Sequence, residues 1–318
     1  MIGQTDVGPP LPWWRDDQVC RQLPLLYRAY AWYAALAGSI GFDKGAGFLF
    51  RLVGRLHTTV LNRSAFQLIE VDGAPIYVDV TDRRLFWVLD ELRLETDEKR
   101  VLRDLLGSGD TFVDIGANHG SYSVMVSKFV GASGFVVAFE PQPRLSRLVH
   151  ESLVLAKRRN FRVFDCACLD RETDVELYIP WRPYDGSGSA GLHRRLSATH
   201  RSSVVVARGA TLDSCLYGAE LPGRMVLKID VEGSELAVLR GARETIRRRR
   251  PPILIEVNAQ SAAAAGTSPE LVLDLLEELG YSRFAEVDEY PAAKPRAKLA
   301  DLSRQRNLLA LHRACPPR

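Results

Sequence analysis

Acidic residues accompany two short apolar runs in the middle of the chain, and a glycine-rich turn follows the first of them. Asp114 lies within the run Thr111–Ile115, which opens into the turn Gly116-Ala-Asn-His-Gly120. Glu140 directly follows the second run, Phe135–Phe139. Acids and a tight glycine turn at strand ends are typical of sites that bind a nucleoside-bearing cofactor at the carboxyl ends of parallel strands. The sequence predicts such a site here.

Two features of the turn favour S-adenosylmethionine over a dinucleotide. Dinucleotide sites use the spacing GxGxxG, with backbone amides aimed at a pyrophosphate, whereas this turn reads GxxxG with Ala117 at the second position. Asp114 would repel a pyrophosphate but attract a sulfonium and an amino group. Glu140 is expected to accept both ribose hydroxyls, and Pro141 to offer the adenine a flat apolar surface.

Strands and helices alternate from Thr111 onward. The predicted strands are continuous apolar runs, at Thr111–Ile115, Phe135–Phe139, Phe161–Cys166, Met225–Asp230 and Ile253–Val257, with two more at Arg283–Val287 and Asn307–His312. The predicted helices are Gly120–Phe129, Arg144–Lys157, Ser234–Arg249 and Pro269–Leu279. Strands without polar alternation are buried on both faces, so we expect an α/β fold with a mostly parallel seven-stranded sheet and helices on both faces.

The remaining segments are predicted to form additions to this core. Residues 13–60 read as two helices, the second at Gly47–His57, and are expected to pack on the main domain or to serve as a membrane contact or dimer arm. A hairpin is predicted at Gln67–Val71 and Pro75–Val80. Two lead-in helices follow, at Leu85–Leu94 and Thr96–Leu106. We place the domain boundary between residues 1–62 and 63–318.

The segment Leu-Lys-Ile-Asp-Val-Glu-Gly-Ser-Glu at 227–235 contains the candidate catalytic groups. Alternation along the strand puts Lys228 and Asp230 on one face, and Glu256 on the next strand is the expected ion-pair partner of Lys228. Asp230 is expected to position the cofactor and Glu232 to contact the methyl acceptor, with Ser234 capping the following helix. Carboxylates at 230, 232 and 256 also suit magnesium, but we predict no metal.

The loop-rich segment Trp181–Ser202 resembles a mobile lid or an ordinary surface loop. As a lid it would bring His193 to the site as a general base. His119, within the glycine turn, is interpreted as a turn residue rather than a catalytic one.

These motifs together resemble the FkbM family of S-adenosylmethionine-dependent methyltransferases. The similarity covers about Asp110 to Val257 and is most specific in the 227–235 block. It implies a class I methyltransferase fold and O-methylation of a hydroxyl on a sugar, glycolipid or polyketide. The alternatives are N-methylation of a small molecule and a membrane-associated module that binds the cofactor without turnover.

The resemblance implies a cofactor site that follows the strand ends. Its predicted residues are Asp114, Gly116, Ala117, Asn118, Gly120, Ser121, Glu140, Pro141, Asp165, Cys166 and Asp230. Many class I enzymes place an acid after the third strand to receive the adenine amino group. Here Cys166-Ala167 occupies that position, flanked by Asp165 and Asp170.

Composition restricts the partners and the compartment. The net charge is +3, and no basic stripe is interleaved with aromatic residues, so a nucleic-acid partner is not expected. The run Arg247–Arg250 is interpreted as a solvated helix end. Five cysteines without a CxxC pair, and an N-terminus without a secretory pattern, favour a reduced chain in the cytoplasm, with peripheral membrane contact as the alternative.

Overall fold

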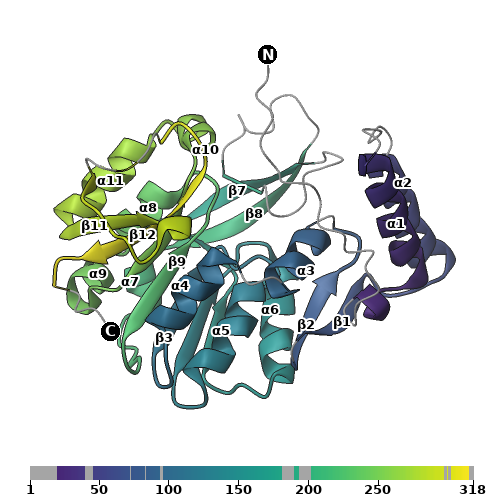
Figure 1. Ribbon diagram of the computed structural model, residues 1–318, viewed down its shortest axis with the longest axis horizontal. Helices are drawn as coiled ribbons and strands as arrows, with labels where there is room; N and C mark the ends of the chain where they lie inside the picture. Colours follow the sequence, from purple (N-terminus) through teal and green to yellow (C-terminus); the bar gives the residue numbers. More distant parts are fainter. Residues whose placement is uncertain are drawn as a thin grey trace.

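The computed structural model describes residues 20–39, 46–71, 73–82, 84–93, 96–180, 190–192, 202–296, 299 and 302–314. Its centre is a seven-stranded sheet in the order β11-β12-β10-β9-β3-β4-β5 (Figure 1). These strands are β3 (Thr111–Ile115), β4 (Phe135–Phe139), β5 (Phe161–Phe164), β9 (Met225–Ile229), β10 (Ile253–Val257), β11 (Tyr281–Glu286) and β12 (Arg306–His312).

The direction of the strands matches the predicted class I methyltransferase architecture. β3, β4, β5, β9 and β10 run parallel. β12 runs antiparallel to β10 and β11, and it enters the sheet between them. The prediction of a mostly parallel sheet closed by the two C-terminal strands is confirmed.

Helices cover both faces of this sheet, and the strand residues alternate between the two layers. Phe112 and Val226 pack into one layer with α3 (Leu85–Arg93), α4 (Asp97–Leu105), α5 (Ser121–Val130) and α6 (Pro143–Leu155). Val113 and Leu227 pack into the other. That second layer contains α7 (Leu212–Cys215), α8 (Glu235–Gly241), α9 (Arg243–Arg249) and α11 (Pro269–Glu278), and α10 (Ala259–Ala264) lies at its rim. Burial on both faces explains the continuous apolar runs.

A second, three-stranded sheet was not expected from the sequence. The predicted strand Phe161–Cys166 stops at Phe164, and the chain then forms β6 (Cys166–Cys168) in the small sheet. β6 pairs in parallel with β8 (Ser202–Ala210), and β7 (Thr173–Pro180) pairs antiparallel with β8. The end of the predicted loop Trp181–Ser202 therefore already belongs to a strand. Residues 181–189 and 193–201 lie outside the described part of the chain.

The predicted helix Ser234–Arg249 is two helices, α8 and α9, separated at Ala242. Gly241 sits at this junction because the chain passes very close to it. A Cβ at this position would lie 1.8 Å from the carbonyl oxygen of Leu169. The backbone contact with the segment after β6 therefore requires a glycine where one continuous helix was predicted.

The N-terminal helices join the same core as α3 and α4. After a short turn, η1 (Cys20–Gln22), they are α1 (Leu25–Ser39) and α2 (Ala46–Arg55), the latter extended by a π-helical turn, η2 (Leu56–Val60). Tyr27 and Tyr30 contact Phe50 edge-to-face, with ring centroids 5.9 and 5.2 Å apart. The predicted hairpin is present as β1 (Phe66–Val71) and β2 (Ala74–Asp79).

Two lead-in helices were expected before the sheet, and α3 and α4 confirm them. Thr96 caps α4 by accepting a hydrogen bond from the backbone N–H of Lys99. Within the described residues, no helix has the length and apolarity needed to cross a bilayer.

We predict that Gly241→Ala destabilises the protein by about 1–3 kcal/mol, since the new methyl group would overlap the Leu169 carbonyl. Gly54→Ala within α2 is the matched control. Its Cβ would be 3.7 Å from its nearest neighbours, so the substitution should gain up to about 1 kcal/mol of helix propensity. Urea unfolding of both variants measures the difference. Equal stability of the two variants would contradict the close approach at Gly241.

Candidate functional site

The site is built where the loops after β3 and β9 cross. These two strands are neighbours, and the chain continues from them to opposite sides of the sheet. Gly116, with φ +87°, begins the loop after β3, and a Cβ there would lie 1.9 Å from the carbonyl oxygen of Asp230. The crossing is the reason why this position requires a glycine. A crevice at such a reversal is the usual ligand site of an open α/β sheet.

A cavity opens at this crossing. Its walls come from the segments that follow β3 and β4, from β6, and from the segment that follows β9. The predicted cofactor residues among its lining are Gly116, Ala117, Asn118, Ser121, Glu140, Pro141, Cys166 and Asp230. Its lining combines apolar side chains with converging charged and polar groups, and such a lining at the ends of parallel strands is typical of a small-molecule site.

Glu140 is held in the cavity wall by two backbone amides. The N–H of Asn118 donates to one carboxylate oxygen (2.8 Å), and the N–H of Gln142 donates to the other (2.9 Å). Burial raises the pKa of Glu140 to about 7, although both amides oppose that rise. The Gln142 side chain is a third donor to this carboxyl group. A carboxylate has about four acceptor sites, so acceptor capacity remains for a hydroxyl of a ligand.

Three predicted cofactor residues are absent from the cavity lining. Asp114 is fully buried beneath it, and its carboxylate accepts a hydrogen bond from Ser123 (2.7 Å). Gly120, with φ +82°, precedes α5, and a Cβ there would lie 3.0 Å from Val149 of α6. It therefore serves helix packing, where we had expected close approach of the cofactor. Asp165 is exposed between β5 and β6.

The expected adenine region is formed by the small second sheet. Cys166, Ala167 and Cys168 of β6 line the cavity there. Cys166, Cys168 and Cys215 are free thiols. A hydrogen bond with Cys166 lowers the pKa of the Cys215 thiol to about 7.

Lys228 forms its ion pair with Asp230, which corrects the prediction that Glu256 is its partner. Lys228 Nζ lies 3.1 Å from Asp230 Oδ2 and 4.8 Å from the ring centroid of Tyr122. The register of the parallel strands explains the difference. Leu254 pairs with Lys228, so Glu256 lies two residues beyond it along β10. The predicted shared face of Lys228 and Asp230 is confirmed by this contact.

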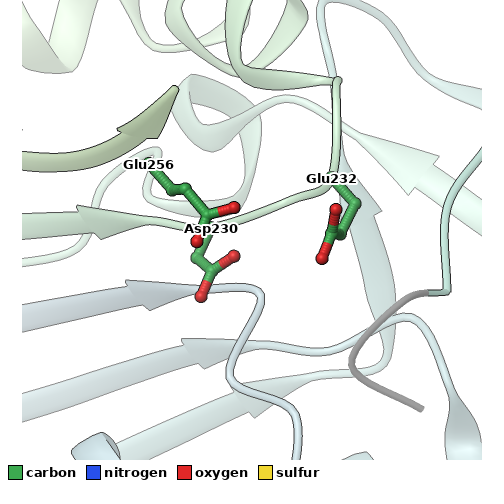
Figure 2. A group of neighbouring side chains, drawn as sticks. All are labelled: Asp230, Glu232 and Glu256. Atoms are coloured by element: carbon green, nitrogen blue, oxygen red, sulfur yellow. The ribbon is translucent and has the colours of Figure 1, made fainter. Parts of the chain in front are cut away.

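Three carboxyl groups meet at the ends of β9 and β10. Oxygen atoms of Asp230, Glu232 and Glu256 lie within 4.8 Å of one another, and Figure 2 shows them at neighbouring strand ends and on the adjoining loop. Burial alone would raise the pKa of Asp230, but Lys228 and Arg84 hold it below its usual range. Burial, then repulsion from Asp230, raises the pKa of Glu232 to about 8. The site thus combines an ionised acid with a carboxyl group that binds and releases a proton near neutrality.

Glu232 adopts a backbone conformation that is uncommon for its residue type. Its φ is +53°, and its carboxylate accepts a hydrogen bond from the Ser261 hydroxyl (3.2 Å). Ser234 occupies the N-cap position of α8 but makes no capping hydrogen bond. Instead, Glu235 accepts one from the N–H of Gly233 (2.9 Å), because its carboxylate folds back over the first turn. Strain of this kind persists where the surroundings hold it, as at functional sites.

Residues from α3 and the turn before it also line the cavity, and no sequence pattern indicated them. Arg84 bonds to Glu91, and Glu91 accepts a hydrogen bond from Ser121. Tyr122 in α5 was also missed, although its place after the glycine turn was a usable signal. A second cavity adjoins the first through Arg84, Glu91, Tyr122, Lys228 and Asp230. It continues to Glu98, Glu256 and Asn307, whose side-chain amide donates to Glu98 (2.8 Å).

His119 does not line either of these cavities. His193 lies outside the described residues. His119 is fully buried, and its Nδ1 lies 2.7 Å from Asn118 Oδ1. Burial lowers the pKa of His119, so the ring is neutral at physiological pH.

We predict that Glu256→Gln stabilises the protein at alkaline pH. Burial, then repulsion from Asp230 and Glu232, raises the pKa of Glu256 from 4.5 to about 9. The unfolded chain therefore releases its proton first, and the free energy of unfolding falls as pH rises between these values. Removing the acid should raise the free energy of unfolding by about 1–3 kcal/mol near pH 8 and by less near pH 5.

Thermal unfolding followed by circular dichroism at both pH values measures the gain. The control is Glu278→Gln, which removes an exposed carboxylate paired with Arg243 and should give no such gain. A gain that does not depend on pH would contradict the raised pKa.

This chain is similar to a known methyltransferase and, in structure, to several solved proteins. Hexuronic acid methyltransferase AglP of Haloferax volcanii is 25% identical over 218 residues, which cover 66% of this chain and 80% of that protein. The crystal structure of methyltransferase FkbM from Methylobacillus flagellatus matches with a TM-score of 0.40 at 16% identity. The match covers 87% of this chain and 65% of that one. The crystal structure of Aeropyrum pernix fibrillarin matches with a TM-score of 0.37 at 12% identity. This match covers 78% of this chain and 94% of that one. TM-scores this low do not support a fold assignment, so the assignment rests on the order and direction of the strands.

The family itself is identified by a match over more than half of the sequence. The methyltransferase FkbM domain matches residues 114–283, from the acid of β3 to the middle of β11. This range contains the crossing loops, Glu140 and the carboxyl cluster. The chain belongs to the FkbM family of methyltransferases, and S-adenosylmethionine is its methyl donor.

Proposed function

We propose that this protein transfers a methyl group to a hydroxyl oxygen of a sugar. The observation that carries this proposal is Glu232, a carboxyl group in the cavity wall with a pKa near 8. A hydroxyl must lose its proton as it is methylated, and a base whose pKa lies near the working pH is the most effective acceptor. The relationship to a hexuronic acid methyltransferase supports a sugar as the carrier of that hydroxyl.

The residues present suit the methyl donor. When bound, S-adenosylmethionine supplies a methyl group on a positively charged sulfur, which a nucleophilic oxygen can attack. Glu140 has hydrogen-bonding capacity left for the ribose, and the loop from Gly116 to Asn118 offers close backbone approach. Asp230 stays ionised and provides negative charge near the cation, while Lys228 fixes its orientation.

Glu232 is the proposed acceptor of the proton that the hydroxyl loses during methyl transfer. The acceptor oxygen forms a bond to the methyl carbon as the carbon–sulfur bond breaks, and the hydroxyl proton passes to the carboxylate of Glu232. Ser261 orients that carboxylate through its hydrogen bond. Asp230 is a poor base because its pKa is lowered, so its role is electrostatic.

The second cavity is the proposed acceptor site. Glu232 lines the first cavity, but an oxygen of its carboxylate lies within 4.8 Å of those of Asp230 and Glu256, which line the second, so the base stands at the boundary between the two. Acids, an amide and an aromatic ring line it, and such groups bind the hydroxyls and ring faces of sugars. Its acids are Glu91, Glu98, Asp230 and Glu256, and its cations are Arg84 and Lys228. Arg84 and Lys228 are already paired with acids of the same lining. These acids would repel a carboxylate on the acceptor. We therefore expect a sugar without a carboxylate to be methylated faster than a hexuronic acid.

We predict that Glu140→Ala weakens S-adenosylmethionine binding by about 1.5–3 kcal/mol, since charge-assisted hydrogen bonds to the ribose are lost. Isothermal titration calorimetry of both proteins measures the change. Asp165→Ala is the matched control, because this acid was predicted for the same site but is exposed and away from the cavity lining. Unchanged affinity in Glu140→Ala would remove Glu140 from the cofactor site.

We predict that Glu232→Gln lowers kcat by about 10²–10⁴-fold with little change in cofactor affinity. The wild-type rate should rise with pH as the carboxyl group ionises, and the variant should lose that dependence. Transfer of labelled methyl groups to neutral sugars, hexuronic acids, phenols and amines is the measurement, followed by identification of the methylated atom. Asp165→Asn is the control. An equal rate in Glu232→Gln would exclude Glu232 as the base, and label on nitrogen alone would overturn O-methylation.

A further inference from the structure

The outer faces of α1 and α2 combine large apolar side chains with arginines. In α2 and its extension, the exposed residues recur at helical spacing as Phe48, Arg51, Leu52, Arg55 and Leu56. Phe48 is 66% exposed and Leu52 41%. The opposite side of α2 packs Phe50 and Val53 into the core. The exposed stripe is therefore not needed to hold the helix in place.

The same pattern occurs on the neighbouring helix. Leu25, Arg28, Trp32 and Tyr33 are exposed on α1, while Tyr27 and Tyr30 are buried. Leu25 is 75% and Trp32 61% exposed. The two helices contact each other at one edge of the molecule, beyond β1 and β2 (Figure 1).

Apolar exposure is concentrated in this part of the chain. Of the seventeen large apolar side chains that are exposed among the described residues, ten lie between Leu25 and Leu68. The other seven are scattered from Trp87 to Leu271. Clustered exposure of this kind marks an interaction surface, whereas scattered exposure is ordinary.

The charge of the same segment is one-sided. Between Leu25 and Leu68 the sequence has five basic residues, Arg28, Lys44, Arg51, Arg55 and Arg63, and one acid, Asp43. The whole chain is nearly balanced, with 42 basic and 39 acidic residues. The partner of this face must therefore combine an apolar region that accepts these side chains with a negatively charged surface.

We propose that this N-terminal face, defined by the exposed residues of α1, α2 and η2, binds the surface of an anionic lipid bilayer. Apolar side chains of an interfacial helix enter the acyl boundary, and arginine stems run along it while their guanidinium groups reach lipid phosphates. Trp32 is of the residue type that prefers this boundary. A second copy of the chain would set arginines against arginines, which disfavours a symmetric dimer through this face.

The test is co-sedimentation of the full chain with lipid vesicles. Vesicles of phosphatidylcholine containing about one third phosphatidylglycerol are compared with pure phosphatidylcholine. We expect the protein to pellet with the anionic vesicles only, and to be released at about 0.5 M salt, where charges are screened.

Paired variants identify the surface. Arg51→Glu with Arg55→Glu should lower the partition coefficient on anionic vesicles by about tenfold or more, and Phe48→Ser with Leu52→Ser should lower it comparably. The controls are Arg171→Glu and Val206→Ser, which change exposed residues elsewhere and should bind as wild type. Cofactor titration and circular dichroism verify that each variant is folded.

Each other result overturns the proposal. Wild-type protein that stays in the supernatant, or variants that pellet like wild type, would exclude the N-terminal face as a lipid contact. A dimer in light scattering that the α2 variants dissociate would assign the face to a second copy. None of these readouts depends on methyl transfer, so the proposed activity can fail while this inference stands.

Discussion

The close crossing of the loops after β3 and β9 is the constraint on which the site depends. Gly116 has no side chain because the Asp230 carbonyl occupies its place, and the backbone N–H of Asp230 donates to Ile115. This contact fixes the loop that leads to Asn118, whose N–H holds Glu140. It also fixes the start of the loop that carries Glu232. The residues proposed to bind the cofactor and those proposed to act in catalysis thereby depend on one backbone contact, and a shift there would move both together.

Charge is balanced around that crossing by burying acids with cations. Lys228 lies in register with Asp114 and pairs with Asp230, so one ammonium group serves a structural acid and a functional one. Both acids raise the pKa of Lys228 against the effect of burial. Among the described residues, neither Glu232 nor Glu256 forms an ion pair, and burial, then repulsion from Asp230, raises the pKa of each. The same imbalance that costs stability at alkaline pH gives Glu232 a pKa useful for accepting a proton.

The sequence predicted those parts of the structure whose signal is local. The runs of β3, β4 and β10 have the predicted bounds because strands buried on both faces are apolar throughout. The sheet of β6, β7 and β8 was missed because β6 pairs with a strand some forty residues later, and no local pattern encodes that partner. The break at Ala242 was also missed, and the neighbouring Gly241 lies against the Leu169 carbonyl of a segment distant in the sequence. The prediction that Glu256 is the partner of Lys228 was wrong because the distance between two strands along the sequence does not determine their register.

This division between local and distant signals also explains why the cofactor is easier to infer than the acceptor. The cofactor cavity is lined mainly by segments that directly follow strands, so short motifs describe it. The second cavity joins elements from the two ends of the chain, as when Asn307 of β12 donates to Glu98 of α4. Residues brought together in this way can change one at a time without disturbing the crossing at Gly116. Relatives with the same motifs can therefore differ in acceptor, and the charge of this lining is a better guide to the substrate than the motifs are.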